Sequence, residues 1–210
     1  MRQISYKDLR EFLSQVDAMG ELKTIRGAHW DKEMGSITEM VYRERPVDSP
    51  ALLFRDIPEY PPEYTCLYGM LASAARFSLS MEIETKVGLA GRQDLLTAYR
   101  NKMKQMKPVA ALTVTTGPVT ENIIEGADVD LFKFPVPVHH ELDGGRYIGT
   151  ACGVITRDPD EGWINVGTYR VQVLNNRQAL SYISQGKQGR IQRDKYLKKG
   201  KPCPMAIVVG

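Results

Sequence analysis

The segment 163–170, WINVGTYR, places an amide, a hydroxyl and a guanidinium group close together in the sequence. Asn165 can offer a neutral carbonyl oxygen to a hard cation such as Mg²⁺ or Mn²⁺. Arg170 can neutralise a phosphate or a carboxylate, or orient a nearby acid. Gly167 has no side chain and would let a cofactor approach the backbone. These residue types indicate one side of a site for an anionic ligand and a metal.

The spacing of Asn165 and Arg170 sets a geometric condition on that site. Residues five apart on a regular strand point to opposite faces of the sheet. The two side chains can serve one site only if a bulge or a break intervenes, and Gly167 is the natural place for it. The alternative is an ordinary exposed sheet face.

A second candidate is the basic turn SQGKQGRIQRDK, which contains Lys187, Gln188 and Arg190 and leads into a predicted helix. Backbone N–H groups and the positive end of a helix dipole favour phosphate binding at such a turn. The turn does not match a P-loop, which requires GxxxxGK followed by Ser or Thr. A solvated basic turn is the alternative.

Two other polar groups favour structural roles. His139 and His140 are adjacent, so on an extended chain they point to opposite sides and do not easily share one ion. Asp158, Asp160 and Glu161 lie in a DPDEG turn, a composition typical of a solvated loop. Neither group predicts a catalytic site.

Composition narrows the class of protein. The 210 residues include 28 basic and 25 acidic side chains, a balance that does not favour nucleic acid or membrane partners. No apolar run approaches the ~20 residues of a membrane span, and the start of the chain lacks the apolar core of a signal peptide. Three widely spaced cysteines predict neither a disulfide framework nor a metal site. We expect a soluble cytoplasmic protein.

The first 110 residues mix helices with a short strand. Ser5 and Asp8 resemble a capping box for a helix that ends at Gly20, and a second helix is predicted over about 33–44. A strand is predicted at 51–54, with further helices over 71–81 and 94–106. This mixture predicts an α/β or α+β unit over residues 1–110.

The residue composition changes after Pro108, where β-branched and aromatic residues, which favour strands, become frequent. Strands are predicted over 111–119, 147–158, 163–174 and 179–184, with a hairpin turn at Asn175 and Asn176. A helix ending at Gly200 and a last strand, MAIVVG, follow. An apolar strand with no turn or cap after it would be an aggregation hazard if left unpaired, so we expect pairing partners later in a longer chain. The alternative is a C-terminal strand added to a complete sheet.

In order along the chain, four segments resemble successive signatures of the UbiD family. They are SYKDLREFLSQVDAMGELKTI, DVDLFKFPVPVHHELDGGRYIGT, ITRDPDEGWINVGTYRVQV and GKQGRIQRDKYLKKGKP. The resemblance implies a decarboxylase, a carboxy-lyase, that acts on aromatic or α,β-unsaturated acids with prenylated FMN, Mn²⁺ (or Mg²⁺) and K⁺. It implies an α+β fold, with the α/β domain followed over residues 111–210 by the first part of a split β-barrel of the flavin-binding type.

The resemblance also implies roles for individual residues. Asn165 corresponds to the amide metal ligand, and the backbone carbonyl of Trp163 to a ligand of the monovalent ion. Arg170 corresponds to the arginine that works with carboxylates beside the flavin ring. Cofactor contacts are implied for Thr150, Gly167, Thr168, Tyr169, Arg170, Lys187 and Gln188.

The chain departs from the family pattern in two ways. Gln188 stands where the family usually has a histidine ligand, so a metal here would lose a nitrogen donor. The family's acidic metal ligand and catalytic glutamates fall beyond residue 210. We therefore expect the N-terminal portion of such an enzyme, inactive as the isolated chain.

Two alternatives remain at this stage. One is a non-catalytic flavin-binding or interaction module derived from the same fold. The other is a split-barrel FMN oxidoreductase, which would not share DVDLFKFPVP and DGGRY. The partners implied are a small unsaturated or aromatic acid, a flavin prenyltransferase that supplies the cofactor, and further copies of the chain in a homo-oligomer.

Overall fold

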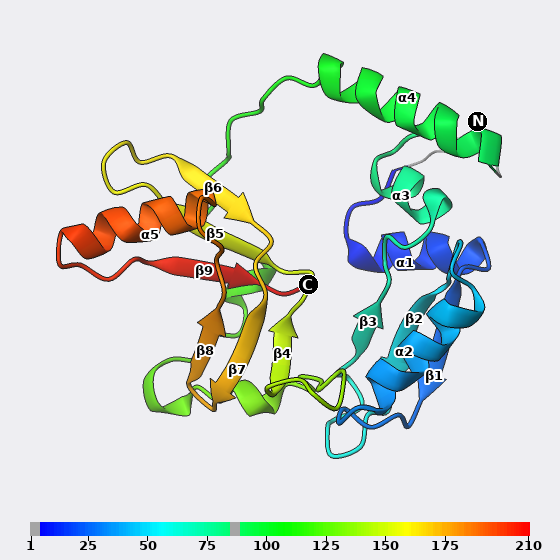
Figure 1. The fold of residues 1–210 in the computed structure, drawn as a ribbon, viewed down its shortest axis with the longest axis horizontal. Coiled ribbons are helices and arrows are strands. Elements are labelled where there is room, and N and C mark those ends of the chain that lie inside the picture. Colours follow the sequence, from blue (N-terminus) through cyan, green and yellow to red (C-terminus); the bar gives the residue numbers. More distant parts are fainter. Residues whose placement is uncertain (1–4, 85–88) are drawn as a thin grey trace. The chain divides into compact units, whose positions relative to one another are not determined.

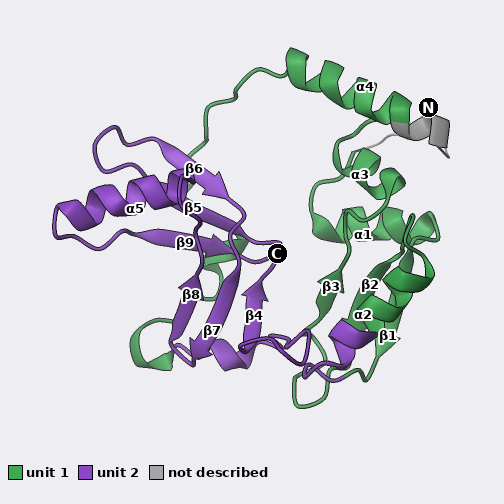
Figure 2. Cartoon of the chain, in the orientation of Figure 1, with its two compact units in different colours: residues 1–28, 37–128 green, residues 29–36, 129–210 purple. Residues whose placement is uncertain are grey.

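A computed structural model describes residues 5–84 and 89–210 of the chain. These residues form two compact units (Figure 2). Unit 1 comprises residues 1–28 and 37–128, and unit 2 comprises residues 29–36 and 129–210. Residues 29–36 belong to unit 2 because Lys32 N–H donates to the Val138 carbonyl at 2.9 Å and Val138 N–H donates to the Trp30 carbonyl at 3.1 Å. The division differs from the predicted border after residue 110, which stays a prediction.

Unit 1 is built around a three-stranded sheet in the order β1-β2-β3 (Figure 1). Strand β1 (Leu22–Arg26) is parallel to β2 (Ala51–Arg55), and β3 (Cys66–Tyr68) is antiparallel to β2. The helices of the unit are α1 (Leu9–Ala18), α3 (Ala74–Ser80) and α4 (Leu89–Gln105), with 3₁₀ turns η1 (Pro118–Thr120) and η2 (Gly126–Asp128). Helix α2 (Glu33–Glu44) begins in unit 2 and continues into unit 1. The mixed α/β character predicted for this region is confirmed.

Helix α1 begins differently from the prediction. Asp8 is the N-cap, because its carboxylate accepts the backbone N–H groups of Arg10 and Glu11 at 2.9 and 3.0 Å. The predicted capping box of Ser5 with Asp8 is therefore wrong, since Asp8 itself satisfies the first free N–H groups of the helix. The apolar face of α1 packs Phe12 and Val16 against Ala51 and Leu79, and these four residues form one core cluster of the unit.

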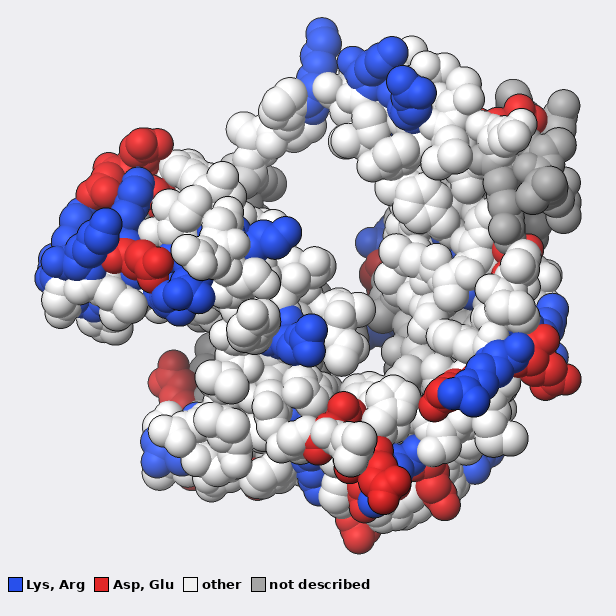
Figure 3. Space-filling view, in the orientation of Figure 1, with Lys and Arg blue, Asp and Glu red and all other residues white. Residues whose placement is uncertain are grey.

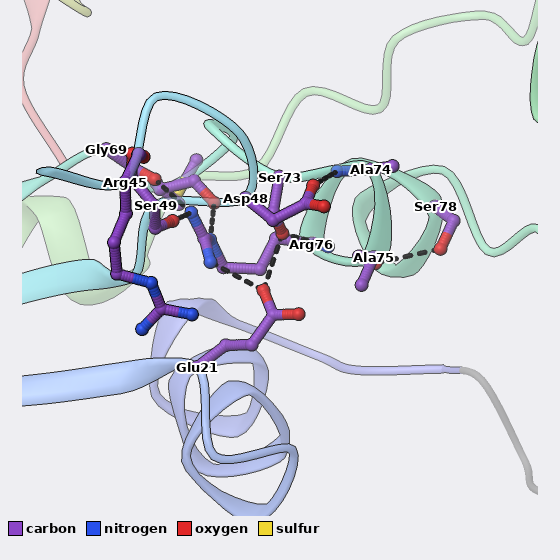
Figure 4. Close-up of polar contacts among 11 residues, drawn as sticks. Glu21, Arg45, Asp48, Ser49, Gly69, Ser73, Ala74, Ala75, Arg76 and Ser78 are labelled. Atoms are coloured by element: carbon purple, nitrogen blue, oxygen red, sulfur yellow. Dashed lines mark hydrogen bonds and ion pairs between the residues drawn. The ribbon is translucent and has the colours of Figure 1, made fainter. Parts of the chain in front are cut away.

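A buried arginine connects four parts of unit 1 (Figure 4). Arg76 of α3 is 0% exposed. Its guanidinium donates to Glu21 Oε2 at 2.5 Å, to the Ser49 carbonyl at 2.5 Å, and to the carbonyls of Gly69 and Met70 at 3.1 Å each. The charge is stabilised in the interior because it meets both a carboxylate and oriented carbonyl dipoles.

Unit 2 contains two antiparallel three-stranded sheets, ordered β4-β7-β8 and β6-β5-β9 (Figure 1). The strands are β4 (Arg146–Gly149), β5 (Gly153–Arg157), β6 (Ile164–Gly167), β7 (Val171–Asn175), β8 (Gln178–Ser181) and β9 (Met205–Val208), with 3₁₀ turn η3 (Leu131–Lys133) and helix α5 (Gln188–Lys198). Cys152, Val154 and Val171 form one core cluster of the unit. The hairpin turn predicted at Asn175 and Asn176 is confirmed, because it joins β7 to β8.

Three predicted strands are corrected. Residues 111–119 form no strand: all but Gly117 are exposed, with only η1 at their end, because extended residues need a pairing partner to make a strand. The strand predicted over 147–158 is two strands, β4 and β5, and the one over 163–174 is also two, β6 and β7. At both breaks the chain passes from one sheet to the other, so no single strand continues.

The last predicted strand is present as β9, which pairs with β5 from Gly153↔Val208 to Thr156↔Met205. Across the described ranges 5–84 and 89–210, no helix is both long enough and apolar enough to span a membrane.

Candidate functional site

The expected break in WINVGTYR lies directly after Gly167. Strand β6 ends at Gly167, residues 168–170 cross over, and β7 begins at Val171 in the other sheet. A Cβ atom on Gly167 would lie 2.4 Å from Cζ of Tyr169, and one on Gly189 would lie 2.9 Å from Cε2 of the same ring. The space beside Gly167, expected to admit a cofactor, is therefore filled by the ring of Tyr169. The backbone N–H of Gly189 donates to the hydroxyl of Tyr169 at 3.3 Å.

Asn165 is held by its side-chain nitrogen. It is half-buried on β6, directly opposite Thr156 of β5, so both side chains lie on one face of the sheet. Asn165 Nδ2 donates to Thr156 Oγ1 at 3.4 Å. Within the described part of the chain, this is the one hydrogen bond that the Asn165 carboxamide makes. Its Oδ1 therefore remains available to accept a hydrogen bond or to bind a cation.

Helix α5 packs on β5 and β6 and brings a buried amide to the same face. Gln192 is 0% exposed. Its Oε1 accepts the hydroxyl of Thr156 at 2.5 Å, and its Nε2 donates to the Trp163 carbonyl at 3.5 Å. Residues Asn165, Thr156 and Gln192 thus form one polar row from strand to helix.

The carbonyl of Trp163 was expected to meet a monovalent ion. It already accepts two hydrogen bonds, from Gln192 at 3.5 Å and from the backbone N–H of Asp158 at 2.9 Å. A carbonyl oxygen has two lone pairs. Both are engaged within the chain, which argues against this carbonyl as an ion ligand.

Gln188 begins α5, one turn before Gln192. Residues four apart share a helix face, so Gln188 lies on the side of α5 that faces β5 and β6. Its side chain is exposed. Lys187 is the N-cap and makes no side-chain capping bond. In the first turn, the N–H of Gly189 is bound by the Tyr169 hydroxyl and that of Arg190 by the Lys187 carbonyl.

Arg170 lies in the crossing segment and is exposed. Its guanidinium carbon is 5.9 Å from the centroid of the Tyr182 ring. No hydrogen bond or ion pair joins it to Asn165 in the described residues. The structure therefore brings Asn165 and the start of α5 to one sheet face, while Arg170 occupies the segment between the two sheets. Thr150 and Thr168, the other predicted cofactor contacts, are also exposed.

The adjacent histidines contribute to a turn. The backbone N–H groups of His139 and His140 both donate to Asp143 Oδ2, at 3.2 and 3.0 Å, and burial lowers the pKa of His139. These contacts favour the structural interpretation. Across residues 5–84 and 89–210, no group of three or more His, Cys, Asp or Glu side chains is placed to hold a metal ion.

An ion pair fixes α5 against the turn between β5 and β6. Asp158 is 3% exposed, and its Oδ2 lies 2.7 Å from Lys195 Nζ. The hydrogen bond from Lys195 is the largest cause that lowers the pKa of Asp158, to about 2. Figure 3 shows basic and acidic side chains next to each other over α5. The composition of the DPDEG turn predicted a solvated loop. That prediction is wrong for Asp158, which is buried and paired with Lys195.

The sequence did not indicate that the polar side chains of Thr156, Gln192 and Asp158 are buried, since polar side chains are usually exposed. One signal was available for Thr156. It lies two residues after the apolar Val154 on β5, and residues two apart on a strand share a face. Gln192 had a weaker signal, its position four residues after Gln188.

Comparison with known proteins identifies the class. Residues 111–210 match the family model "UbiD: 3-octaprenyl-4-hydroxybenzoate carboxy-lyase Rift-related domain". The chain is 31% identical over 210 residues to a pyrrole-2-carboxylic acid decarboxylase of Pseudomonas aeruginosa, covering 97% of this chain and 41% of that protein. It therefore spans less than half the length of this relative.

Solved structures give the same result. The vanillic acid decarboxylase of Sedimentibacter hydroxybenzoicus in its closed form matches with a TM-score of 0.85 and 26% identity, over 98% of this chain and 43% of that one. An evolved dimeric form of the UbiD-class enzyme HmfF from Pelotomaculum thermopropionicum, in complex with prFMN, matches with a TM-score of 0.81 and 25% identity, over 98% and 44%. The fold and sequence define a chain related to decarboxylases. Its residues 111–210 match the Rift-related domain of the UbiD family, and the chain matches the N-terminal portion of its relatives.

Proposed function

We propose that this chain forms one side of the active site of a UbiD-type (de)carboxylase that acts on an aromatic or α,β-unsaturated carboxylic acid with prenylated FMN. The observation that carries the proposal is the placement of Asn165 on β6, a strand that α5 contacts, with its amide nitrogen bound to Thr156 and its oxygen left for a cation. The shared fold with the prFMN-containing HmfF structure supports the cofactor.

The residues present fit a cofactor phosphate and a divalent metal. The side chain of Lys187 and the positive end of the α5 dipole, at which Lys187 makes no side-chain capping bond, supply positive charge for a phosphate. Asn165 and Gln188 can each offer an amide oxygen, the type of ligand that Mg²⁺ and Mn²⁺ accept. A potassium ion would need ligands other than the Trp163 carbonyl, whose lone pairs are engaged.

When bound, prenylated FMN accepts the electron density that remains after carbon dioxide leaves. Arg170 would hold the substrate carboxylate or a neighbouring acid as an ion pair. Thr150, Thr168 and the ring of Tyr169 would line the flavin and exclude water. Proton transfer would fall to carboxylic acids that we assign to no residue of this chain.

Co-expression with a flavin prenyltransferase tests the proposal on the protein that carries this chain, produced at its natural length. We expect the purified protein to contain a species with the mass and absorbance of prenylated FMN. A protein purified without flavin would overturn the proposal. A flavin-loaded protein that turns over no aromatic or unsaturated acid would favour the alternative, a non-catalytic flavin-binding module.

Substitution of Arg170 tests its role in the same protein. We expect Arg170→Ala to lower decarboxylation on the order of 10²–10³-fold, as for loss of one group that stabilises developing charge, while flavin stays bound. Arg177→Ala is the matched control, since Arg177 is exposed in the β7–β8 turn of the same unit. Undiminished turnover by Arg170→Ala would contradict the assigned role.

A further inference from the structure

We propose that Thr156 and Gln192 are positioning residues, which fix the carboxamide of Asn165 so that Oδ1, and not the amide nitrogen, is presented to a cation. The proposal rests on the proposed function, because it concerns the same metal ligand. It is carried by three consecutive hydrogen bonds that join β6, β5 and α5.

The direction of these hydrogen bonds is set at a backbone carbonyl. The Trp163 oxygen lies 3.5 Å from Gln192 and can only accept a hydrogen bond. Gln192 must therefore turn its NH₂ group toward Trp163, and its Oε1 toward Thr156. A side-chain amide is oriented by the network around it, and here one end of the network cannot reverse.

Thr156 in turn determines the orientation of the Asn165 carboxamide. Its hydroxyl carries a single proton, which it donates to Gln192 Oε1 at 2.5 Å. Thr156 Oγ1 is then an acceptor toward Asn165, and only the NH₂ group of Asn165 can satisfy it. At 3.4 Å this last hydrogen bond is long, but its polarity is fixed. Rotation of the carboxamide by half a turn would bring two oxygens together.

Burial makes the arrangement selective. Gln192 is 0% exposed and Thr156 is 2% exposed, so water does not replace a lost partner. A polar group buried without a partner is strongly disfavoured. Since hard cations bind the oxygen of a carboxamide and not its nitrogen, a fixed orientation raises the fraction of molecules that are ready to bind metal.

Calorimetric titration with Mn²⁺ tests the proposal in the protein at its natural length. Thr156→Val removes the hydroxyl and Gln192→Met removes the amide, each with little change in shape. We expect either variant to weaken Mn²⁺ binding about 10–100-fold, the usual effect of losing a residue that orients a metal ligand. Thr156→Ser, which keeps the hydroxyl, should bind Mn²⁺ as the wild type does.

Gln172→Met is the matched control. Gln172 of β7 also donates its side-chain nitrogen to a backbone carbonyl, that of Gly144 at 2.7 Å, but it does not contact Asn165. We expect it to leave Mn²⁺ affinity unchanged. Equal losses in Gln172→Met and Gln192→Met would show a general structural effect and overturn the proposal.

Asn165→Ala separates this proposal from the proposed function. If Asn165→Ala binds Mn²⁺ like the wild type, the metal assignment itself fails. If it loses binding while Thr156→Val and Gln192→Met do not, the positioning role fails and the metal assignment stands. Should these variants not fold, the wild type still decides: nuclear Overhauser effects must connect the Asn165 side-chain NH₂ to Thr156, and their absence would contradict the proposal.

Discussion

Asn165 and Gln188 illustrate how much a single residue type can decide. Both side chains offer a metal only a neutral amide oxygen, whereas a histidine offers an imidazole nitrogen, which manganese and zinc bind well. The exposed side chain of Gln188 on α5 can be exchanged without disturbing a buried contact.

We expect Gln188→His to raise Mn²⁺ affinity, because it restores a nitrogen donor on the helix face that carries Gln192. Calorimetry at pH 7.5 (roughly one unit above the ordinary histidine pKa of ~6.5) keeps most of the imidazole neutral. Gln185→His is the control, since Gln185 is exposed in the loop before α5. An equal gain at both positions would show that Gln188 has no particular relation to the metal.

Gly167 and Tyr169 form a second residue-scale pair, because the ring occupies the place of a side chain at position 167. We expect Gly167→Ala to destabilise the protein by about 1–3 kcal/mol in urea unfolding, as over-packing does. In a Tyr169→Ala background the same change should cost much less. Gly153→Ala is the control, since its Cβ would meet no atom closer than 3.9 Å. Additive effects of Gly167→Ala and Tyr169→Ala would contradict the contact.

At the scale of elements, the sequence predicted helices more accurately than strands. The helix expected over 33–44 has those bounds in the structure, because helical spacing and stop signals are local. The strands over 147–158 and 163–174 each divide in two, because a strand ends where its partner ends, and partners such as β5 and β9 lie far apart in the sequence. The break at Gly167 could be predicted only from the assumption that the side chains of Asn165 and Arg170 serve one site.

The attachment of α5 to the β5–β6 turn is an element-scale prediction. The folded-state pKa of Asp158 is about 2, below its ordinary 3.8, so its ionised form stabilises the fold above pH 3.8 and this contribution is lost as the pH falls toward 2. Asp158→Asn should therefore lower the urea midpoint at pH 7 and lower it less at pH 3. Glu161→Gln, in the same turn, is the control. A difference independent of pH would contradict an ionic role.

At the scale of the whole molecule, the sequence predicted a mixed α/β chain of the UbiD family but not what holds unit 1 together. Arg76 is buried, and nothing in its neighbourhood in the sequence, SAARFSLS, indicates that. Its partners Glu21 and Ser49 lie 55 and 27 residues earlier in the sequence. Buried polar side chains of this kind depend on the assembled structure, so patterns of local spacing cannot find them.

We expect Arg76→Ala to destabilise unit 1 by about 3–5 kcal/mol, since it removes the cation paired with Glu21 and a hydrogen-bond donor from three carbonyls. Arg76→Lys should recover only part of this loss, because an ammonium group cannot reach all four acceptors at once. Arg45→Ala is the control, since the side chain of Arg45 is exposed nearby (Figure 4). Differential scanning calorimetry measures all three, and equal effects of Arg76→Ala and Arg45→Ala would contradict the assignment.

The pairing of β5 with β9 also has a consequence for synthesis of the chain. Ile155 pairs with Ala206, 51 positions later in the sequence. At 5–20 residues per second, a ribosome needs roughly 3–10 s to cover that interval. During this time β5 has one neighbour, β6, and its other edge can pair with strands of other nascent chains. Slower translation lengthens that exposure, so the pace of synthesis, as well as the final free energy of folding, affects how much correctly paired protein accumulates.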